Sequence, residues 1–298
     1  MANAQGIDIS FWQDNKSTPQ RFLPRMAIDR GISFAGIKVS QANYLDPDYM
    51  INWATCRPML YRMPYHFLVW DVDPRKQAET FWGALEKDTY GILPLICDFE
   101  WWRTTPSNAL DILHRFINRM KQLTDLPLGI YTAKYFWDAY GSKDPYWKQF
   151  KLWLCDISGP VEVPSPWAVW DFWQYTFKLP GLEYGVESLD LDGNFYNGTL
   201  DDMVAAYNLP HLDSLTNLYG DGTTQPVSTD HLFTGEVIAP LGLYVRALPS
   251  ITAPQVGALA QGDIIRVREI DAHEVWYRVD NGWIAGRWNG WKYVQEAK

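Results

Sequence analysis

The sequence predicts an α/β barrel domain followed by a small all-β domain. Over residues 1 to about 209, short apolar runs alternate with amphipathic stretches of helical length. This alternation is typical of a parallel sheet covered by helices, and a closed (β/α) barrel is the commonest solution for a segment of about 200 residues. From residue 231 onward, short strand-like runs alternate with turns, which indicates a small β barrel.

Strands of the first domain are expected where apolar residues cluster. The predicted ranges are 6–11, 34–40, 63–69, 91–100, 127–132, 151–156 and 169–175. Helices are expected between them, one of them over 76–87. Another should begin after Thr105, an N-cap residue followed by Pro106. Beyond these two residues, apolar side chains at Leu110, Leu113 and Ile117 recur at helical spacing.

The chain changes character after the first domain. Residues 210–230 are polar and aperiodic, which indicates a linker between a domain of residues 1–209 and one of residues 231–298. Strands are predicted over 242–246, 264–269, 276–279 and 282–285. The tripeptide Asp280-Asn281-Gly282 is a strong hairpin signal.

Composition excludes several classes of function. The net charge of −9 argues against nucleic acid as a partner. Residues 231–298 hold seven basic and seven acidic residues, so the excess negative charge belongs to the first domain. The three cysteines, Cys56, Cys97 and Cys155, form no metal-binding spacing and no disulfide framework. Cys97 and Cys155 are expected to be buried thiols. We predict neither a metal nor a cofactor.

The N-terminal residues lack the basic and apolar segments of a secretory signal. No stretch approaches the ~20 apolar residues of a membrane span. We therefore expect synthesis in a cytoplasm, no membrane insertion, and action on any external target only after release. The sequence indicates no oligomeric state.

Two acids at the end of an apolar run carry the first chemical signal. Asp98 and Glu100 follow residues 91–97, and side chains two apart on a strand point to the same side, with Cα atoms roughly 6–7 Å apart. Hydrolysis of a glycosidic bond uses a pair of carboxyl groups with separated pKa values. The 16 tryptophans fit either sugar recognition or a large aromatic core.

Further acids lie on the first and last predicted segments of the barrel. These segments are neighbours in a closed barrel, so Asp8 and Asp190 are expected to face each other across the site. Asp192 precedes Gly193 and Asn194, and we expect these residues to form a turn.

A series of motifs then occurs in order along the first domain. The motifs are Gly6-Ile7-Asp8-Ile9-Ser10-Phe11-Trp12-Gln13, Gly36-Ile37-Lys38-Val39-Ser40-Gln41, Tyr65-His66-Phe67, Asp98-Phe99-Glu100, Gly129-Ile130-Tyr131-Thr132, Trp173-Gln174-Tyr175-Thr176 and Leu189-Asp190-Leu191-Asp192. The series resembles glycoside hydrolase family 25, the Chalaropsis-type lysozymes, over residues 4–200. The resemblance implies a modified (β/α) TIM-like barrel and N-acetylmuramidase activity. That activity cleaves the β-1,4 bond between N-acetylmuramic acid and N-acetylglucosamine in peptidoglycan.

The resemblance also implies roles for the acids. Glu100 corresponds to the general acid, and Asp98 either stabilises the developing charge or orients the substrate's N-acetyl group. Asp98 is expected to raise the pKa of Glu100 through its negative charge. Asp8 and Asp190 correspond to the other acids of the site. Direct attack by water and assistance by the N-acetyl group remain alternatives.

Substrate contacts are expected from polar and aromatic residues along the groove. The candidates are Tyr65, Tyr131, Lys38, Trp153, Trp173, Gln174 and Trp101. Core packing is the alternative for Tyr65, Tyr131, Trp153, Trp173 and Gln174, and a structural ion pair is the alternative for Lys38. Trp101 and Trp102 could form a sugar platform or a lid. Many relatives carry an acidic residue and a glycine where Gln41 and Ala42 stand. His66 is expected to be a structural residue and His114 to face solvent.

The second domain resembles bacterial SH3-like wall-binding modules. The resemblance rests on residues 242–250, 256–263, 276–279 and 282–284, and it implies binding of peptidoglycan. Tyr244, Trp276 and Trp283 are candidate contacts, or alternatively core residues. A tethered binder raises the local concentration of the catalytic domain at the wall. With no signal peptide, this arrangement fits a phage endolysin. The alternatives are a chitinase-like or glucosaminidase enzyme, or a non-catalytic wall-binding protein, against which the four acids argue.

Overall fold

The computed structural model describes residues 2–13, 22–85, 88–101, 103–212, 233–248, 253–270, 276–279, 282–288 and 291–296. The described residues up to 212 form one compact unit and those from 233 form a second. Most of the predicted linker, residues 213–230, lies outside the described residues. No helix among the described residues is long and apolar enough to cross a membrane.

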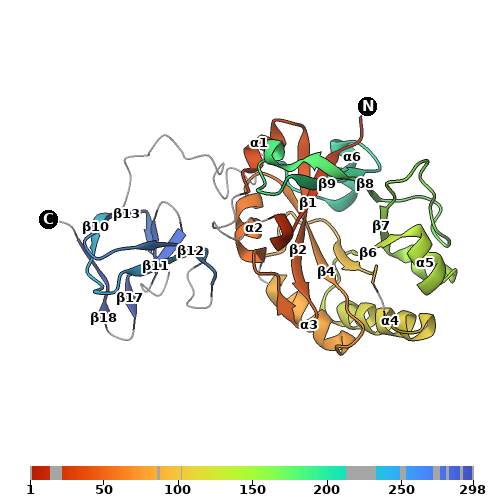
Figure 1. Cartoon of the computed structure of the whole chain (residues 1–298), viewed down its shortest axis with the longest axis horizontal. Coiled ribbons are helices and arrows are strands. Elements are labelled where there is room, and N and C mark those ends of the chain that lie inside the picture. Colours follow the sequence, from red (N-terminus) through yellow and green to blue (C-terminus); the bar gives the residue numbers. More distant parts are fainter. Residues whose placement is uncertain are drawn as a thin grey trace. The chain divides into compact units, whose positions relative to one another are not determined.

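Eight strands of the larger unit close into a barrel (Figure 1). They are β1 (Gln5–Ile9), β2 (Ile32–Gln41), β4 (Tyr61–Phe67), β5 (Leu95–Asp98), β6 (Leu128–Ala133), β7 (Lys151–Cys155), β8 (Phe172–Pro180) and β9 (Asp190–Tyr196). Their order is β1-β9-β8-β7-β6-β5-β4-β2, and β2 pairs with β1 to close the ring. A short strand, β3 (Tyr44–Leu45), extends β2 as a hairpin.

The predicted barrel is confirmed, and each predicted strand overlaps an observed one. Strand β9 is the exception to the parallel arrangement, because it runs antiparallel to both β1 and β8. The prediction of a turn at Asp192-Gly193-Asn194 was wrong. These residues lie within β9, where their backbone groups pair with neighbouring strands.

Helices surround the barrel in Figure 1. They are α1 (Pro24–Ile28), α2 (Tyr49–Cys56), α3 (Pro74–Leu85), α4 (Pro106–Leu123), α5 (Lys134–Tyr140) and α6 (Leu200–Tyr207), with short 3-10 helices η1 (Phe11–Gln13), η2 (Pro145–Gln149) and η3 (Gly181–Tyr184). Helix α4 begins as predicted, because the hydroxyl of Thr105 accepts a hydrogen bond from the backbone N–H of Asn108 and Pro106 is the first helical residue.

Apolar side chains form two layers, one on each side of the strands. Inside the barrel, Phe34, Met63 and Trp153 belong to one buried cluster. Outside it, Ile130 from β6 packs in a second cluster with residues of the helices, including Leu113 of α4. Since alternate residues of a strand face opposite sides, each strand contributes to both layers.

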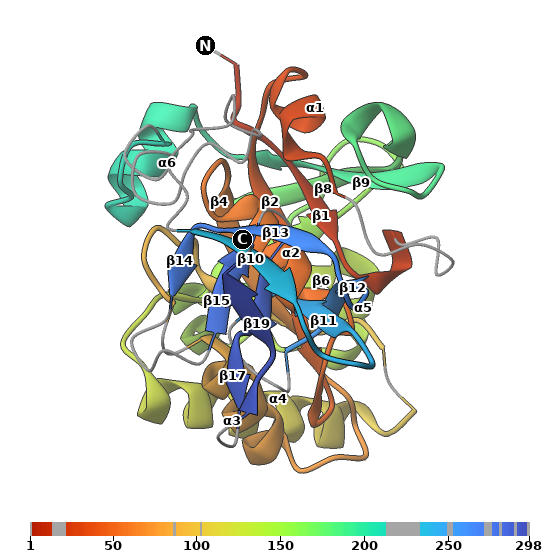
Figure 2. The ribbon, with the colours of Figure 1, turned by 90° about the vertical axis from the view of Figure 1, so that its left-hand side faces the viewer.

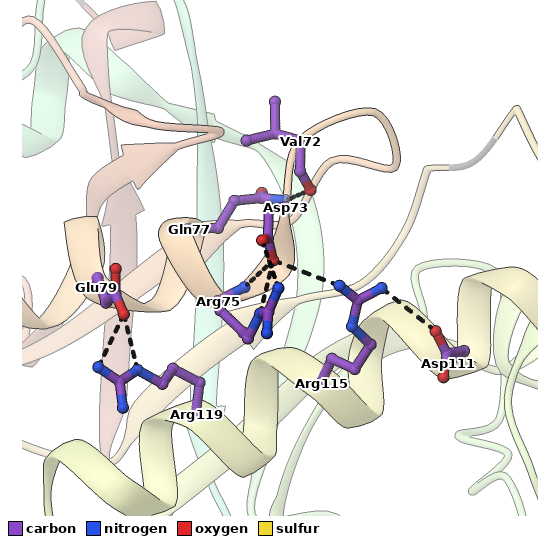
Figure 3. Close-up of polar contacts among 8 residues, drawn as sticks. All are labelled: Val72, Asp73, Arg75, Gln77, Glu79, Asp111, Arg115 and Arg119. Atoms are coloured by element: carbon purple, nitrogen blue, oxygen red, sulfur yellow. Dashed lines mark hydrogen bonds and ion pairs between the residues drawn. The ribbon is translucent and has the colours of Figure 1, made fainter.

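Charged residues join α3 to α4 at the surface (Figure 3). Asp73, just before α3, accepts from Arg75 at 3.0 Å and lies 3.5 Å from Arg115 of α4, while Glu79 and Arg119 pair at 2.8 Å. Exposed pairs of this kind contribute little to stability, because solvent screens their charges. The apolar contact beneath them, including Phe81 and Phe116, therefore provides most of the stabilisation between the two helices.

Two histidines of the larger unit, His66 on β4 and His114 on α4, lie in different environments. His66 is fully buried, with Nδ1 at 2.8 Å from the Ser40 hydroxyl and Nε2 at 3.1 Å from Gln77, so its structural role is confirmed. His114 was expected to face solvent, but it is half-buried because its ring packs against Tyr146 and Trp147.

Every described element of the second unit is a strand. They are β10 (Phe233–Val237), β11 (Leu243–Arg246), β12 (Gln255–Leu259), β13 (Ile264–Val267), β14 (Glu269–Ile270), β15 (Trp276–Val279), β16 (Gly282–Ala285), β17 (Arg287–Trp288), β18 (Trp291–Lys292) and β19 (Val294–Glu296). Figure 2 shows β10 beside β13 and β19, with which it pairs. Strands β15 and β16 pair antiparallel as the predicted hairpin requires, although its residues Asp280 and Asn281 lie outside the described residues.

Candidate active site

A cleft of about 310 Å³ opens at the carboxyl ends of the parallel strands. It is lined by Asp8, Ser10, Trp12, Gln13, Lys38, Tyr65, Phe67, Asp98, Glu100, Tyr131, Trp153, Gln174 and Asp192. Each of the eight barrel strands contributes at least one of these residues. Strand β9 contributes from its beginning, because an antiparallel strand starts where its parallel neighbours end. This face is where barrel enzymes carry their active sites.

Asp98 and Glu100 point into the same cleft, as predicted. Asp98 is the last residue of β5, and Phe99 turns the other way, where it is fully buried against Phe136 and Trp137. Anchoring of Phe99 on the outer side therefore fixes both acids on the inner side. Asp98 is buried, whereas Glu100 is exposed at the mouth of the cleft.

Both carboxyl groups have raised pKa values. Although part of the Glu100 side chain is exposed, the cleft withdraws its carboxyl group from water, which raises the pKa of Glu100, and the charge of Asp8 raises it further. Burial raises the pKa of Asp98 well above its usual range, with a further increase from Glu100 that Lys38 opposes. The two carboxyl groups repel each other, and the increase in the pKa of Glu100 expected from Asp98 stays a prediction.

One oxygen of Asp98 has an unusual position. The Oδ1 atom is buried and has no hydrogen-bond partner among the described residues. A buried carboxylate oxygen without a partner costs free energy, and functional sites are one place where that cost is tolerated. The atom is thus available to a donor carried by a ligand.

A chain of side-chain hydrogen bonds fixes Asp8. Its Oδ2 atom accepts from Asn194 Nδ2 at 2.7 Å and from Gln174 Nε2 at 3.1 Å. The amide oxygen of Gln174 in turn accepts from the Tyr131 hydroxyl at 2.7 Å, and that of Asn194 accepts from Trp153 Nε1 at 2.8 Å. The two amides therefore have a single orientation in which each donates to Asp8.

Asp192 completes the group of acids. It lies opposite Asp8 in the pairing of β1 with β9 and shares a hydrogen bond with it. Burial, followed by the charge of Asp8, raises the pKa of Asp192 to about 8. With this pKa, Asp192 holds a proton at neutral pH and donates it toward Asp8. Burial raises the pKa of Asp8 as well, and the hydrogen bonds from Asn194, Gln174 and Asp192 oppose that increase.

The prediction that Asp190 faces Asp8 was wrong. Asp190 is exposed and forms an ion pair with Lys178 at 2.6 Å, opposite Pro180 in the part of the β8–β9 hairpin that extends past β1. Asp192, two residues further along, has the place that we assigned to Asp190. The signal that could have identified it is the spacing of Asp192 and Asn194, which is the same as that of Asp98 and Glu100.

Lys38 is a buried cation in this acidic cleft. Its Nζ donates to Gln41 Oε1 at 2.8 Å and lies 4.9 Å from the centre of the Phe67 ring. It makes no direct ion pair with a described carboxylate, so its charge acts on Asp98 and Glu100 through space. Burial lowers the pKa of Lys38, and these acids oppose that decrease.

The other predicted contacts separate into three groups. Tyr65, Tyr131, Trp153 and Gln174 line the cleft, with Trp153 also part of the barrel core. Trp101 is 43% exposed in an adjoining hollow. Trp173 does not line the cleft, because it alternates with Gln174 along β8 and its Nε1 donates to the backbone of Asp156. Trp102 lies outside the described residues.

Sequence reasoning missed four lining residues besides Asp192. They are Ser10, Trp12, Gln13 and Phe67. The carboxamide oxygen of Gln13 accepts from the backbone N–H of Ser10 at 2.7 Å, which holds the turn after β1 at the cleft. Trp12 is 64% exposed, and an exposed tryptophan beside four acids is suited to contact a sugar ring.

A barrel cleft that holds several carboxyl groups with raised pKa values is suited to hydrolysis of a glycosidic bond, which is the chemistry of glycoside hydrolases. Residues 7–181 match the family model described as glycosyl hydrolases family 25, and the chain belongs to this family. The chain is 28% identical over 230 residues to "Lysozyme M1" of Streptomyces globisporus, covering 70% of this chain and 72% of that protein.

Solved structures share the fold. A lysozyme from Streptomyces coelicolor matches with a TM-score of 0.59 and 24% identity, covering 70% of this chain and 98% of that one. A muramidase from Trichobolus zukalii matches with a TM-score of 0.58 and 25% identity, covering 68% and 98%. The similarity therefore spans nearly the whole of these proteins and the larger unit of this one.

Proposed function

We propose that this protein is a muramidase that hydrolyses the β-1,4 bond between N-acetylmuramic acid and N-acetylglucosamine in peptidoglycan. Membership of family 25 and similarity to a curated lysozyme support this substrate. The observation that carries the proposal is the convergence of Asp8, Asp98, Glu100 and Asp192 in one cleft.

Glu100 is the proton donor. Its raised pKa keeps the carboxyl group protonated at higher pH than an ordinary glutamate, and its exposure at the mouth places it beside a bound polymer. As the bond between C1 of the muramic acid and the glycosidic oxygen breaks, the Glu100 proton moves to that oxygen. The leaving sugar thereby departs as a neutral alcohol.

Asp98 orients the substrate's N-acetyl group. Its unpartnered Oδ1 accepts the N–H of the acetamido group, which directs the acetamido oxygen to C1 as the bond breaks. Water then attacks C1, displaces the acetamido oxygen and gives its proton back to Glu100. The product has N-acetylmuramic acid with retained β configuration at its new reducing end, and proton NMR of the fresh product tests this step. An initial α product would indicate direct attack by water instead.

Asp8 stabilises the positive charge that develops at C1. Hydrogen bonds from Asn194 and Gln174 hold its carboxylate in place before the substrate arrives. Preorganised charge of this kind costs no reorganisation during the reaction. Protonated Asp192 supplies a third donor and avoids a second negative charge next to Asp8.

The variant Glu100→Gln tests the assignment. On purified cell walls we expect a loss of about 10²–10⁴-fold, the usual contribution of general acid catalysis. On the β-fluoride of GlcNAc–MurNAc the loss should be much smaller, because fluoride departs without a proton. Glu183→Gln, at an exposed glutamate of η3, is the control. Full activity of Glu100→Gln on walls would contradict the proposal.

Products identify the bond that is cut. Mass spectrometry of digested peptidoglycan should find muramic acid at the new reducing ends. Glucosamine at those ends would indicate a glucosaminidase, and efficient cleavage of chitin oligomers would indicate a chitinase-like enzyme. Intact walls after digestion would leave only the non-catalytic alternative.

We further propose that residues 231–298 form an SH3-like unit that binds the cell wall, joined by a linker of residues 210–230 to the catalytic domain of residues 1–209. A hydrolase with such a binder suits a phage endolysin that is stored in the host cytoplasm and reaches the wall after release. Cells that express the protein should stay intact until their membrane is permeabilised and should then lyse. Lysis without permeabilisation would contradict this localisation.

A further inference from the structure

A second hollow adjoins the cleft beside Glu100. It has a volume of about 450 Å³ and is lined by Gln41, Phe67, Glu100 and Trp101. It shares Glu100 and Phe67 with the cleft but none of the other acids. Glu100 therefore stands between two spaces, one rich in carboxyl groups and one bounded by aromatic rings and an amide.

We infer that this hollow binds the leaving N-acetylglucosamine unit. The inference rests on the proposed muramidase function, in which the general acid lies between the sugar that is attacked and the sugar that departs. Positive charge develops on the attacked sugar, which must lie among Asp8, Asp98 and Asp192. The space on the other side of Glu100 is then left for the departing sugar.

The lining residues suit an N-acetylated sugar. Trp101 is 43% exposed, and the guanidinium of Arg103 lies 5.1 Å from the centre of its ring, which steadies one face of the indole. The other face can pack against the C–H groups of a sugar ring. The volume lies within the range of about 300–1,000 Å³ that is common for ligand sites.

Gln41 supplies the polar contact. Its amide oxygen is occupied by Lys38 at 2.8 Å, while its amide nitrogen donates to no other described residue. The nitrogen therefore offers N–H donors to the acetamido oxygen of the sugar. Phe67, whose ring lies 4.9 Å from the Lys38 ammonium, separates the two spaces.

Two substrates that differ only beyond the cleaved bond test the inference. The tetrasaccharide GlcNAc–MurNAc–GlcNAc–MurNAc places a sugar in the hollow, whereas GlcNAc–MurNAc β-fluoride leaves it empty. For Trp101→Ala we expect kcat/KM on the tetrasaccharide to fall about 10-fold or more, equivalent to about 1.4 kcal/mol. On the fluoride the change should stay within about two-fold, and Trp101→Phe should restore part of the loss.

Matched variants separate this effect from others. Trp12→Ala, at an exposed tryptophan of the cleft itself, should weaken both substrates. Tyr90→Ala removes an exposed aromatic residue at the opposite end of β5 and should change neither. Equal losses on both substrates for Trp101→Ala, or no loss on either, would overturn the inference. Failure of the unmodified enzyme on both substrates would instead reject the muramidase function.

Discussion

The proton held between Asp8 and Asp192 makes this cleft sensitive to pH. Asp192 keeps its proton up to a pKa of about 8, whereas an unperturbed aspartate loses it near 3.8. Above pH 8 two negative charges would lie side by side in a buried site. Both the geometry of the acids and the stability of the fold therefore depend on this one proton.

Asp192→Asn should flatten the dependence of stability on pH. Between pH 3.8 and 8 the folded protein binds a proton at Asp192 that the unfolded chain has released, so stability falls as pH rises, by at most about 1.4 kcal/mol per pH unit for this group. Asparagine still donates to Asp8 but does not titrate. We expect urea unfolding at pH 5 and pH 8 to show a smaller difference for the variant.

Asp190 provides the control for that experiment. It lies two residues away, is exposed and pairs with Lys178, and its charge is the smallest of the named influences that raise the pKa of Asp192. Asp190→Asn should therefore keep most of the pH dependence of the unmodified protein. If Asp192→Asn and the unmodified protein lose stability equally between pH 5 and pH 8, the proton is not held at Asp192.

A glycine makes room for the acids. A Cβ atom on Gly36 would lie 2.7 Å from Asp8 Cβ and 2.9 Å from Trp153 Cη2, closer than atoms can approach. We expect Gly36→Ala to displace Asp8, to lower kcat and to destabilise the fold by about 1–3 kcal/mol, as overpacking does. Gly83 of α3 has nothing within 4 Å of such an atom, and Gly83→Ala should stabilise by about 0.5–1 kcal/mol. Urea unfolding and steady-state kinetics measure both effects.

Individual site residues were predictable where the strand pattern was local. Asp98 and Glu100 follow an apolar run, and their alternation with Phe99 is evident in the sequence. Asp192 was not predictable in the same way, because Gly193 and Asn194 also occur in turns. Their conformation is fixed by pairing with β1, a contact between residues almost 190 positions apart.

At the scale of elements, the antiparallel β9 is what brings the last acids to the cleft. If β9 ran parallel to its neighbours, its last residue, Tyr196, would lie at the cleft. Asp192, near its first residue, would then lie toward the far end of the barrel. Local propensity does not determine strand direction. The seven other barrel strands were predictable because each contains apolar residues that are buried, although the second half of β8 is half-buried or exposed.

His66 joins three elements and should be essential to their packing. It hydrogen-bonds Ser40 of β2 and Gln77 of α3 and stacks on Phe116 of α4. His66→Ala would leave a cavity and remove partners from two buried groups, so we expect a loss of about 3–5 kcal/mol. His114→Ala, at a half-buried ring on the outside of α4, should cost markedly less. Equal losses in urea unfolding would contradict this role.

The same histidine sets an acid limit on the fold. Burial lowers the pKa of His66 to about 3, from an ordinary value of 6.5. The unfolded chain thus gains a proton as pH falls below 6.5 while the folded chain does not, and stability decreases toward pH 3. This trend opposes that of Asp192, and together they favour maximal stability at mildly acidic pH.

For the whole molecule, closure of the barrel is the condition for the site. Since each of eight strands supplies a lining residue, no fragment of the sheet holds the complete set. The length of the first domain and its alternation of apolar runs with amphipathic stretches were sufficient to predict the closed barrel. The short strand-like runs and turns after residue 231 were sufficient to predict a β-rich second unit. The hollow at Trp101 was not predictable, because it depends on the side of Glu100 on which the Trp101 side chain lies.

The second unit offers a test of wall binding through two aromatic residues with opposite environments. Tyr244 is 57% exposed, with the Arg246 guanidinium 5.6 Å from its ring centre, whereas Trp276 is only 5% exposed. Trp276 is therefore a core residue, and Tyr244 is the better candidate for contact with the wall; Trp283 is half-buried between these extremes.

We expect Tyr244→Ala to lower binding to purified walls about ten-fold without changing thermal stability or activity on the soluble tetrasaccharide. A tethered binder acts by raising effective concentration at an insoluble substrate, so it gives no advantage on a soluble one. Trp276→Ala should also lose binding, but with a lower melting temperature because it leaves a cavity. Wild-type binding by Tyr244→Ala would exclude that residue as a contact, and equal losses on soluble and insoluble substrates would show that the second unit does not act by tethering.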